Sequence, residues 1–165
     1  MGENDIRFLK AYQEWCGFNS AFSVLSYAGT VNTHSLGEIP DSASSGTALA
    51  CGVKTRNGMI GLDPSGKTIP SIAEIAKRKG FRIGIITNVA INDATPASFY
   101  AHRSSRRDYS GIARDMVESG FDLFVGWGIA SPGNALSLAK ERGYTVVQSW
   151  NDFLSHGTLP LIALL

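Results

Sequence analysis

The pair Asp41-Ser42 opens a run of small residues that extends to Ala50, and it holds the first side chains on which chemistry could depend. Small residues at the start of a helix leave a serine hydroxyl exposed with almost no steric cover. The free backbone N–H groups and the helix dipole at such an end attract a phosphate group. A serine placed there could be phosphorylated or could attack phosphorus, provided that a neighbouring charged network activates it. An Asp-Ser pair before small residues is also an ordinary helix N-cap, so the pair alone leaves both interpretations open.

A second group of polar side chains lies within residues 93–107 and contains Asp93, Thr95 and Arg106. The planar fork of an arginine can bind two phosphate oxygens at once, and carboxylate and hydroxyl oxygens are ligands that suit magnesium. Each part also has an ordinary interpretation. The first part is typical of a proline-containing turn, and the Arg-Arg pair is typical of solvated surface charge. His102, in the same stretch, is expected to be a packed or surface histidine, and no role is assigned to it.

Most of the remaining sequence alternates helix and strand patterns, at the spacing of a parallel sheet with helical crossovers. Several of the predicted helices end at a glycine, and the predicted strands are short apolar runs. Helices are predicted over residues 6–15, 69–79, 108–119 and 135–142, and strands over residues 81–87, 121–125 and 144–148. The strand over 81–87 is expected to be buried. The apolar tail over 159–165 is expected to form a buried strand or a helix edge.

Ligands of such sheets gather at the carboxyl ends of the strands. The loop expected after the strand over 81–87 carries Asp93 and Thr95, and the same topology places Ser42 on a strand-to-helix turn. We therefore expect the two groups of polar side chains to converge on one crevice.

Together the two groups resemble motifs of the alkaline phosphatases. The strings that resemble the family's nucleophile region are Asp41-Ser42-Ala43-Ser44-Ser45-Gly46-Thr47-Ala48, Gly52-Val53-Lys54-Thr55 and Asn57-Gly58. The strings that resemble its second motif are Asp93-Ala94-Thr95-Pro96-Ala97, Tyr100-Ala101-His102 and Ser105-Arg106-Arg107. Their order and separation also fit, and the resemblance extends over residues 28–148. It implies an α/β fold, an incomplete alkaline-phosphatase-like three-layer sandwich with a mostly parallel sheet.

The resemblance assigns each of these side chains a role in the hydrolysis of phosphomonoesters. Ser42 would be the nucleophile and would pass through a phosphoserine intermediate. Arg106 would bind the phosphate oxygens as charge spreads in the transition state. Asp41 would orient that arginine and cap the helix. Asp93 matches a position near the magnesium site that varies in the family, and Thr95 matches a magnesium ligand.

The family binds two zinc ions and one magnesium ion, and the resemblance leaves those sites incomplete. Ser42 would lie beside one zinc ion, which would activate its hydroxyl, and Thr95 would bind magnesium. The start of the chain, Met1-Gly2-Glu3-Asn4, resembles the end of a Gly-Asp-Gly-Met-Gly string whose aspartate binds metal in the family. The other ligands lie in the family's later half, and three histidines of this chain do not match them: His34, His102 and His156. We therefore expect one partial domain over residues 1–165, truncated at both ends and inactive or nearly so alone.

Two other functions remain as alternatives. A fold remnant without catalytic activity could keep a helix end that binds phosphate. Residues 61–68 also satisfy the pattern of the P-loop, the phosphate-binding loop of nucleotide-binding proteins. The surrounding sequence is unfavourable for a P-loop, because no regular strand precedes the motif. Pro64 also removes an amide that could bind phosphate, and Pro70 disfavours helical geometry at Ile69, close to where the helix of a P-loop would begin. The residues around Asp63 and Pro64 are instead expected to form a tight turn.

The composition limits the class of protein and its partners. The 165-residue chain is long enough for about one domain with a sizeable core, and its net charge of +1 predicts no nucleic-acid partner. No apolar stretch reaches the length of a membrane span, so no membrane partner is expected. The start lacks the features of a secretory signal, and Cys16 and Cys51 are too few for a disulfide framework. The resemblance implies small phosphomonoesters and inorganic phosphate as ligands and a periplasmic or extracellular location for the full-length relative, and it leaves a homodimer open.

Overall fold

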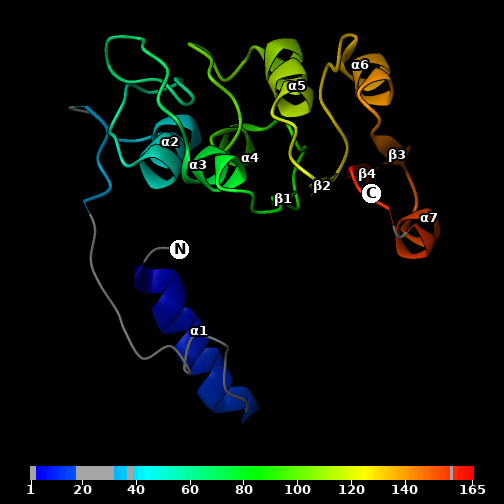
Figure 1. Cartoon of the computed structure of the whole chain (residues 1–165). Coiled ribbons are helices and arrows are strands. Elements are labelled where there is room, and N and C mark those ends of the chain that lie inside the picture. Colours follow the sequence, from blue (N-terminus) through cyan, green and yellow to red (C-terminus); the bar gives the residue numbers. More distant parts are fainter. Residues whose placement is uncertain (1–2, 18–31, 37–38, 157) are drawn as a thin grey trace. The chain divides into compact units, whose positions relative to one another are not determined.

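Two compact units make up the chain, residues Met1–Asn32 and Thr33–Leu165. The computed structural model describes residues 3–17, 32–36, 39–156 and 158–165. In the first unit it describes the helix α1, Glu3–Cys16, which confirms the helix predicted over 6–15 and extends it at both ends (Figure 1). Three aromatic side chains follow one another along this helix. The ring centroids of Phe8 and Tyr12 lie 6.3 Å apart, and those of Tyr12 and Trp15 lie 6.0 Å apart.

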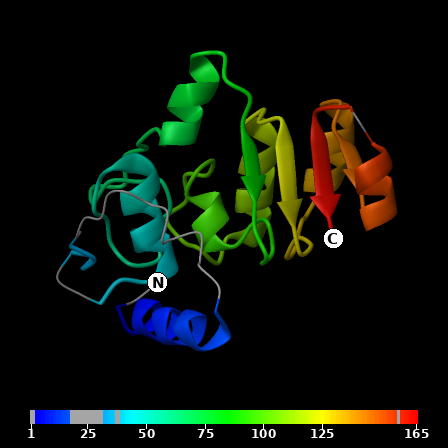
Figure 2. The same cartoon turned by 90° about the horizontal axis from the view of Figure 1, so that it is seen from below.

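A four-stranded parallel sheet forms the centre of the second unit (Figure 2). In chain order its strands are β1 (Gly84–Ile86), β2 (Leu123–Gly126), β3 (Thr145–Val147) and β4 (Leu161–Leu164). Their spatial order is β1-β2-β4-β3, so the last strand lies between the second and the third. The predicted strands over 81–87, 121–125 and 144–148 are confirmed, with shorter or shifted ends. The apolar tail forms β4, and every residue of β4 is buried, as expected.

The expectation that the strand over 81–87 is buried is wrong. Within the described residues β1 pairs only with β2, and it therefore forms one edge of the sheet. Ile86 is 71% exposed, and Phe81, which lies before the strand, is 63% exposed. An apolar run predicts a strand, but burial also requires a second neighbouring strand or a covering helix, which the run does not specify.

The described helices of the second unit are α2 (Ser42–Cys51), α3 (Ile72–Arg78), α4 (Ala94–Ala97), α5 (Tyr109–Glu118), α6 (Ala135–Glu141) and α7 (Trp150–Ser155). Helices α3, α5 and α6 confirm the helices predicted over 69–79, 108–119 and 135–142. α3 begins later than predicted because Ser71 caps it in a reciprocal arrangement with Glu74, so residues 69–71 lie outside the helix. Gly120 and Gly143, which follow α5 and α6, have φ values of +63° and +81°, as expected for glycines that end helices.

Residues 94–97, expected to lie in a loop, form the one-turn helix α4. Asp93 caps this helix by accepting a hydrogen bond from the Ala94 amide at 2.8 Å. Pro96 is tolerated there, because the amides of the first helical turn have no partner inside the helix. The expected loop is therefore corrected to a short helix, which fixes Asp93 at its N-terminus.

Helices cover both faces of the sheet (Figure 1). Phe124 of β2 faces α5 and packs with Ile112 and Met116 in the larger hydrophobic cluster. Its neighbour Val125 faces the opposite side, where Phe153 of α7 packs in a second cluster. Helices on both sides of a parallel sheet confirm the predicted α/β class. None of the described helices combines the length and the apolar character that crossing a membrane would require.

Phe124 offers a direct test of this core. It is fully buried, and its ring contacts those of Tyr100, Phe121 and Tyr144 at centroid distances of 5.4, 6.1 and 6.4 Å. We expect Phe124→Ala to lower the free energy of unfolding by about 3–5 kcal/mol, because it removes buried contacts and leaves a cavity. Urea denaturation followed by circular dichroism measures this loss. The control is Ile86→Ala on the exposed edge, which should change stability by about 0.5 kcal/mol or less; an equal loss in both variants would contradict this description of the core.

Candidate active site

Asp41 joins the start of α2 to a turn at residues 57–58. It is the N-cap of α2, and its Oδ1 accepts a hydrogen bond from the Ser44 amide at 2.9 Å. Its Oδ2 accepts a hydrogen bond from the Gly58 amide at 3.0 Å. The backbone amide of Asp41 donates to Asn57 Oδ1 at 3.2 Å. The helix cap expected at Asp41 is confirmed, and the same carboxylate also fixes the neighbouring turn.

The serines at the start of α2 differ in exposure and in hydrogen bonding. Ser42, the first residue of the helix, is exposed, and so is Ser45. Ser44 is buried, and its hydroxyl donates to Asn57 Oδ1 at 2.9 Å and to the Asp41 carbonyl at 3.2 Å. A hydroxyl that holds a turn in place is a poor nucleophile. The geometry therefore favours an exposed serine for that role, and Ser42 is the one next to Asp41.

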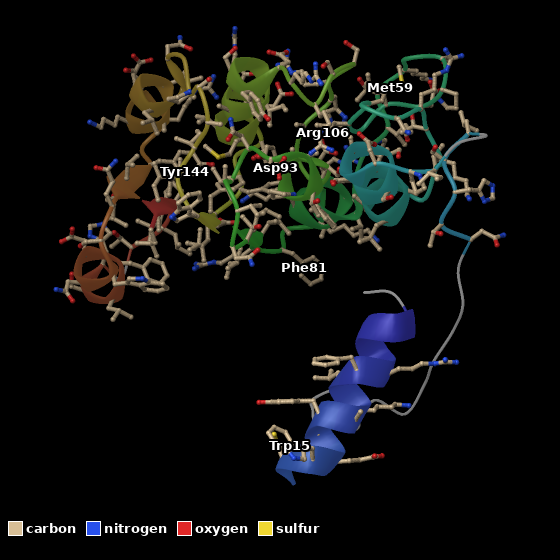
Figure 3. The ribbon with its side chains drawn as sticks, turned by 180° about the vertical axis from the view of Figure 1, so that it is seen from behind. Trp15, Met59, Phe81, Asp93, Arg106 and Tyr144 are labelled. Atoms are coloured by element: carbon tan, nitrogen blue, oxygen red, sulfur yellow. The ribbon has the colours of Figure 1, made fainter. Side chains whose placement is uncertain are left out.

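Arg106 links the two groups of polar side chains. Figure 3 labels it together with Asp93. Its Nη1 lies 3.4 Å from Asp41 Oδ2, and its Nη2 lies 3.2 Å from Asp93 Oδ1. Its backbone amide donates to the Gly58 carbonyl at 2.7 Å. The side chain is 30% exposed, and a guanidinium has five N–H donors, so donors remain for a ligand. The two groups therefore meet at Arg106, as the topology predicted, whereas Arg107 is exposed.

The carboxylate of Asp41 is stabilised in its charged form. Burial alone would raise its pKa, but hydrogen bonds from Ser44, Gly58 and Arg106 outweigh burial and lower the pKa below its usual value. Around Arg106, two carboxylates therefore face one guanidinium, and negative charge is in excess. This arrangement orients the arginine, but it does not by itself attract a dianion.

The buried side-chain amide of Asn92 fixes the backbone next to Asp93. The preceding residue, Asn92, is fully buried, and its Nδ2 donates to the carbonyls of Tyr109 at 3.0 Å and Ala130 at 2.6 Å. Its Oδ1 accepts a hydrogen bond from the Ala130 amide at 2.9 Å. One side chain thus ties the loop after β1 to the loop after β2 and to the start of α5. These bonds fix the backbone on which Asp93 reaches Arg106.

Thr95 lies apart from this cluster. It is exposed and lines an apolar groove of about 420 Å³ beside β1, together with Ile72 and Ile86. In the part of the chain that the structure describes, no hydrogen bond joins its side chain to Asp93 or Arg106. Of the residues singled out in the sequence, the structure therefore brings Asp41, Asp93 and Arg106 into contact and leaves Thr95 outside this contact.

The described residues do not complete a metal site. They contain no group of three or more histidine, cysteine, aspartate or glutamate side chains that could hold a metal ion. Ser42, Asp93 and Thr95 could each supply oxygen ligands, but magnesium takes about six oxygen ligands and zinc about three or four protein ligands. These residues alone therefore do not fit a bound zinc or magnesium ion.

The motif at residues 61–68 is a turn and not a phosphate-binding loop. Asp63 Oδ1 accepts hydrogen bonds from the amides of Ser65 and Lys67, at 2.8 and 2.9 Å. Leu62 and Thr68 form an antiparallel bridge that closes the turn. Amides that a phosphate would need are thus already used, and no helix starts at Lys67. The expected tight turn is confirmed, and the nucleotide-binding alternative is wrong.

Several residues that build the site were not predicted to do so. Asn57 and Gly58 position Asp41, although the sequence singled them out only through the family resemblance. An Asn-Gly pair is a strong turn signal and could have identified this turn. Asn92 has no local signal, because its partners lie 17 and 38 residues away in the sequence.

Comparison with known proteins identifies relatives over most of this sequence. The family model of alkaline phosphatase matches residues 11–123. Alkaline phosphatase 4 of Bacillus subtilis is 38% identical over 119 residues, which are 66% of this chain and 26% of that protein. The alkaline phosphatase of Escherichia coli is 36% identical over 153 residues, which are 88% of this chain and 30% of that protein. The chain therefore spans less than a third of the length of these relatives.

Solved alkaline phosphatase structures share the fold. The Thermus thermophilus enzyme matches with a TM-score of 0.89 and 26% identity, over 99% of this chain and 37% of that chain. The enzyme of the Antarctic bacterium TAB5 matches with a TM-score of 0.83 and 32% identity, over 94% of this chain and 48% of that chain. A histidine-to-aspartate mutant of the TAB5 enzyme, with a TM-score of 0.79, has Mg bound in its M3 site. Because the family model covers most of its length and the shared fold extends over nearly all of it, the chain belongs to the alkaline phosphatase family.

Proposed function

We propose that this chain carries the nucleophile and the phosphate-binding arginine of a phosphomonoesterase that acts through a phosphoserine. The observation that supports this proposal best is the position of Arg106, which lies against Asp93 and against Asp41, the residue before Ser42. A guanidinium held against the residue before an exposed serine at a helix start can bind a phosphate ester and present its phosphorus to the hydroxyl. Membership of the alkaline phosphatase family supports the same chemistry.

The proposed reaction has two steps. In the first, Ser42 Oγ attacks phosphorus, the bond from phosphorus to the leaving oxygen breaks, and the serine proton passes to the leaving alcohol. In the second, water attacks the phosphoserine, the Oγ–P bond breaks, inorganic phosphate leaves, and a proton from the water restores the hydroxyl. The N–H donors of Arg106 that do not face Asp41 or Asp93 hold the non-bridging oxygens, on which negative charge spreads.

The remaining assignments concern the full-length enzyme. Asp41 and Asp93 hold Arg106 from two sides, and Thr95 belongs to the magnesium side of the site, as the family resemblance implies. Ser42 belongs to the zinc side of a centre with two zinc ions and one magnesium ion. The TAB5 mutant with Mg bound supports a magnesium site in this family. The proposed ligands are small phosphomonoesters and inorganic phosphate. The family resemblance favours a periplasmic or extracellular location for the full-length enzyme, and it leaves open whether that enzyme is a homodimer.

Residues 1–165 alone should have little or no activity under this proposal. The cluster around Arg106 has an excess of negative charge, and the described residues contain no group that could hold a metal ion. In addition, no described hydrogen bond joins Ser42 to a base that could take its proton. The lack of a described base or metal-holding group also favours the second candidate function, a remnant of the fold that binds phosphate without catalysis. Its phosphate affinity would be low, because negative charge is in excess around Arg106.

Ser42→Ala tests the nucleophile in a full-length protein that contains this segment. We expect kcat/KM for p-nitrophenyl phosphate to fall by about three orders of magnitude or more, because the covalent route is lost. Acid quenching of the wild-type enzyme during turnover, followed by peptide mass spectrometry, should find the phosphoryl group on Ser42. Ser45→Ala changes another exposed serine of α2 and should retain activity. A phosphoryl group mapped to Ser44 or Ser45 would show that the nucleophile is misassigned.

Arg106 and Arg107 form a matched pair, because they are neighbours in sequence but only Arg106 contacts Asp41 and Asp93. In a full-length protein that contains this segment, Arg106→Ala should slow turnover and weaken inhibition by inorganic phosphate by about 2–4 kcal/mol, because a bidentate charge-assisted contact is lost. The inhibition constant of inorganic phosphate in the p-nitrophenyl phosphate assay measures this affinity. Arg107→Ala should leave it nearly unchanged, and a larger loss from Arg107→Ala would overturn the assignment.

The activity of the 1–165 chain is measured with zinc and magnesium added at alkaline pH. We expect no metal-dependent turnover of p-nitrophenyl phosphate above background, because the described residues contain no group that could hold the ions that would activate Ser42. A rate within about a hundredfold of a typical enzyme rate of ~10 per second would contradict this expectation. It would also mean that His34, His102 or His156 takes part in a metal site.

A further inference from the structure

His102 lies between two hydrogen-bond acceptors from different parts of the second unit. Its Nδ1 is 2.8 Å from the carbonyl oxygen of Gly61, and its Nε2 is 3.0 Å from Glu74 Oε1 on α3. Its side chain is 21% exposed. The sequence predicted a packed or surface histidine without a role, whereas the structure gives each of its ring nitrogens a specific partner.

These two contacts require a proton on each ring nitrogen. A carbonyl oxygen and an ionised carboxylate can only accept hydrogen bonds, so both ring nitrogens of His102 must donate. A neutral imidazole carries one N–H group. It can satisfy Gly61 or Glu74, while its other nitrogen directs a lone pair at an acceptor. Only the imidazolium makes both bonds.

Glu74 is held in place by a second bond. Its Oε2 accepts a hydrogen bond from the Ser71 amide at 2.7 Å, which closes the capping box at the start of α3. The Ser71 hydroxyl accepts from the Glu74 amide at 3.1 Å and donates to the Phe99 carbonyl at 2.6 Å. The carboxylate therefore cannot rotate away from His102 without losing its bond from the Ser71 amide, which is one half of the capping box.

The bond from His102 to Gly61 holds two neighbouring segments together. Ile60 and Arg103 form an antiparallel bridge, with N···O distances of 2.8 and 2.9 Å. Gly61 follows this bridge with a φ of +61°, and a Cβ at this position would collide with the ring of His102. Glycine therefore permits both the backbone conformation and the close approach of the histidine.

The same two segments hold the candidate phosphate site. The Arg106 amide donates to the Gly58 carbonyl at 2.7 Å, and the Gly58 amide donates to Asp41 Oδ2 at 3.0 Å. Separation of residues 58–61 from residues 102–106 would therefore disturb the backbone of Arg106 and one of the bonds that hold Asp41.

We propose that His102 and Glu74 form a proton-dependent latch that positions Arg106 and Asp41 for phosphate binding. The proposal rests on the phosphate site of the proposed function. His102 and Glu74 are positioning residues, because their effect passes through the backbone of Gly58 and its neighbours. While His102 is protonated the two segments are held together, and when it loses its proton one of its two bonds is lost.

The charges and hydrogen bonds around His102 favour its protonated form, in which both bonds of the latch are made. Burial alone would lower the pKa of His102, but its bonds to Glu74 and Gly61 and the charge of Asp115 outweigh burial and raise the pKa above 6.5. Burial alone would raise the pKa of Glu74, but hydrogen bonds from His102 and Ser71 outweigh burial and lower it. Because the folded pKa of His102 is raised, the stabilisation is complete below pH 6.5 and is lost as pH rises through the folded value.

Other charged or titratable groups also face the latch. Asp115 on α5 accepts a hydrogen bond from the His102 amide at 3.2 Å and is paired with Arg103. Cys51 on α2 lies near Glu74, and burial raises the pKa of its thiol to about 11, so this thiol stays neutral while His102 titrates. The thiol therefore adds no charge of its own while His102 titrates, and the pH dependence of the latch is assigned to the histidine.

Glu74→Gln tests the proton requirement with a side chain of the same size. The introduced amide can donate to a neutral Nε2 of His102, and its oxygen can still accept from the Ser71 amide. We therefore expect NMR titration of the His102 ring to give a pKa above 6.5 in the wild-type chain and a lower value in Glu74→Gln. An unchanged titration in the variant, or a wild-type value below 6.5, would overturn the proposal.

Hydrogen exchange separates positioning from general stability. In the wild-type chain the protection factors of the Gly58 and Arg106 amides should fall as His102 loses its proton, while that of the Phe124 amide in β2 should stay constant. In Glu74→Gln all three should stay constant over the same pH range. A parallel fall at all three amides in the wild type would show general stabilisation only and would contradict the positioning role.

Sulfate tests the link to ligand binding, because its charge does not change while His102 titrates. The sulfate affinity of the wild-type chain should fall about fivefold across this titration, and that of Glu74→Gln should change less. Arg106→Ala distinguishes the two proposals. If sulfate does not bind, or if it still binds to Arg106→Ala, the proposed phosphate site is wrong. In that case the hydrogen-exchange results alone test whether His102 and Glu74 position Arg106 and Asp41. Sulfate binding that needs Arg106 but does not vary with pH contradicts the latch alone.

Discussion

The backbone of Gly58 joins the two halves of the candidate site. Its amide donates to Asp41 and its carbonyl accepts from Arg106, at 3.0 and 2.7 Å. Its φ of +83° lies in the region that favours glycine, and no neighbouring atom occupies the space of a Cβ, so backbone conformation and not crowding favours glycine here. Because one residue serves both partners, backbone hydrogen bonds set the position of the Arg106 main chain relative to the start of α2. The ion pairs of the arginine form on this frame.

A phosphate site must both orient its arginine and attract the negatively charged phosphate, and the charges around Arg106 favour only the orientation. Asp41 and Asp93 each take one end of the guanidinium and so determine its orientation. The same carboxylates cancel its positive charge and repel a dianion, so orientation is gained at the expense of attraction. Attraction must come from added positive charge, which is the part that metal ions supply in a phosphoryl-transfer site. An ordered arginine with low intrinsic affinity is therefore what this chain would contribute to a metal-dependent enzyme.

Local signals predicted helices α1, α3, α5 and α6 but not the short helices α4 and α7, and long-range partners explain the errors in burial and side-chain contacts. Gly120 and Gly143 identified the ends of α5 and α6, because a left-handed glycine after a helix is a local requirement. The burial expected for β1 was wrong, because burial depends on neighbours that its apolar run does not encode. The meeting of the two groups of polar side chains, at the contact between Arg106 and Asp41, followed from topology. The bond between His102 and Glu74 did not, because the two residues lie 28 positions apart and neither has a pattern that points to the other.

Side-chain bonds to the backbone explain what holds the loops of the site in place. The loops around it contain little regular structure, so their carbonyls and amides need partners from elsewhere. Asn92 supplies three of these bonds, and the Tyr100 hydroxyl donates to the Ile91 carbonyl at 2.5 Å. The Ser71 hydroxyl does the same for the Phe99 carbonyl. A buried polar group without its partner costs about 1–3 kcal/mol, so each such bond penalises alternative loop conformations. The position of Arg106 is therefore set by folding, and a ligand that binds there need not organise the loops first.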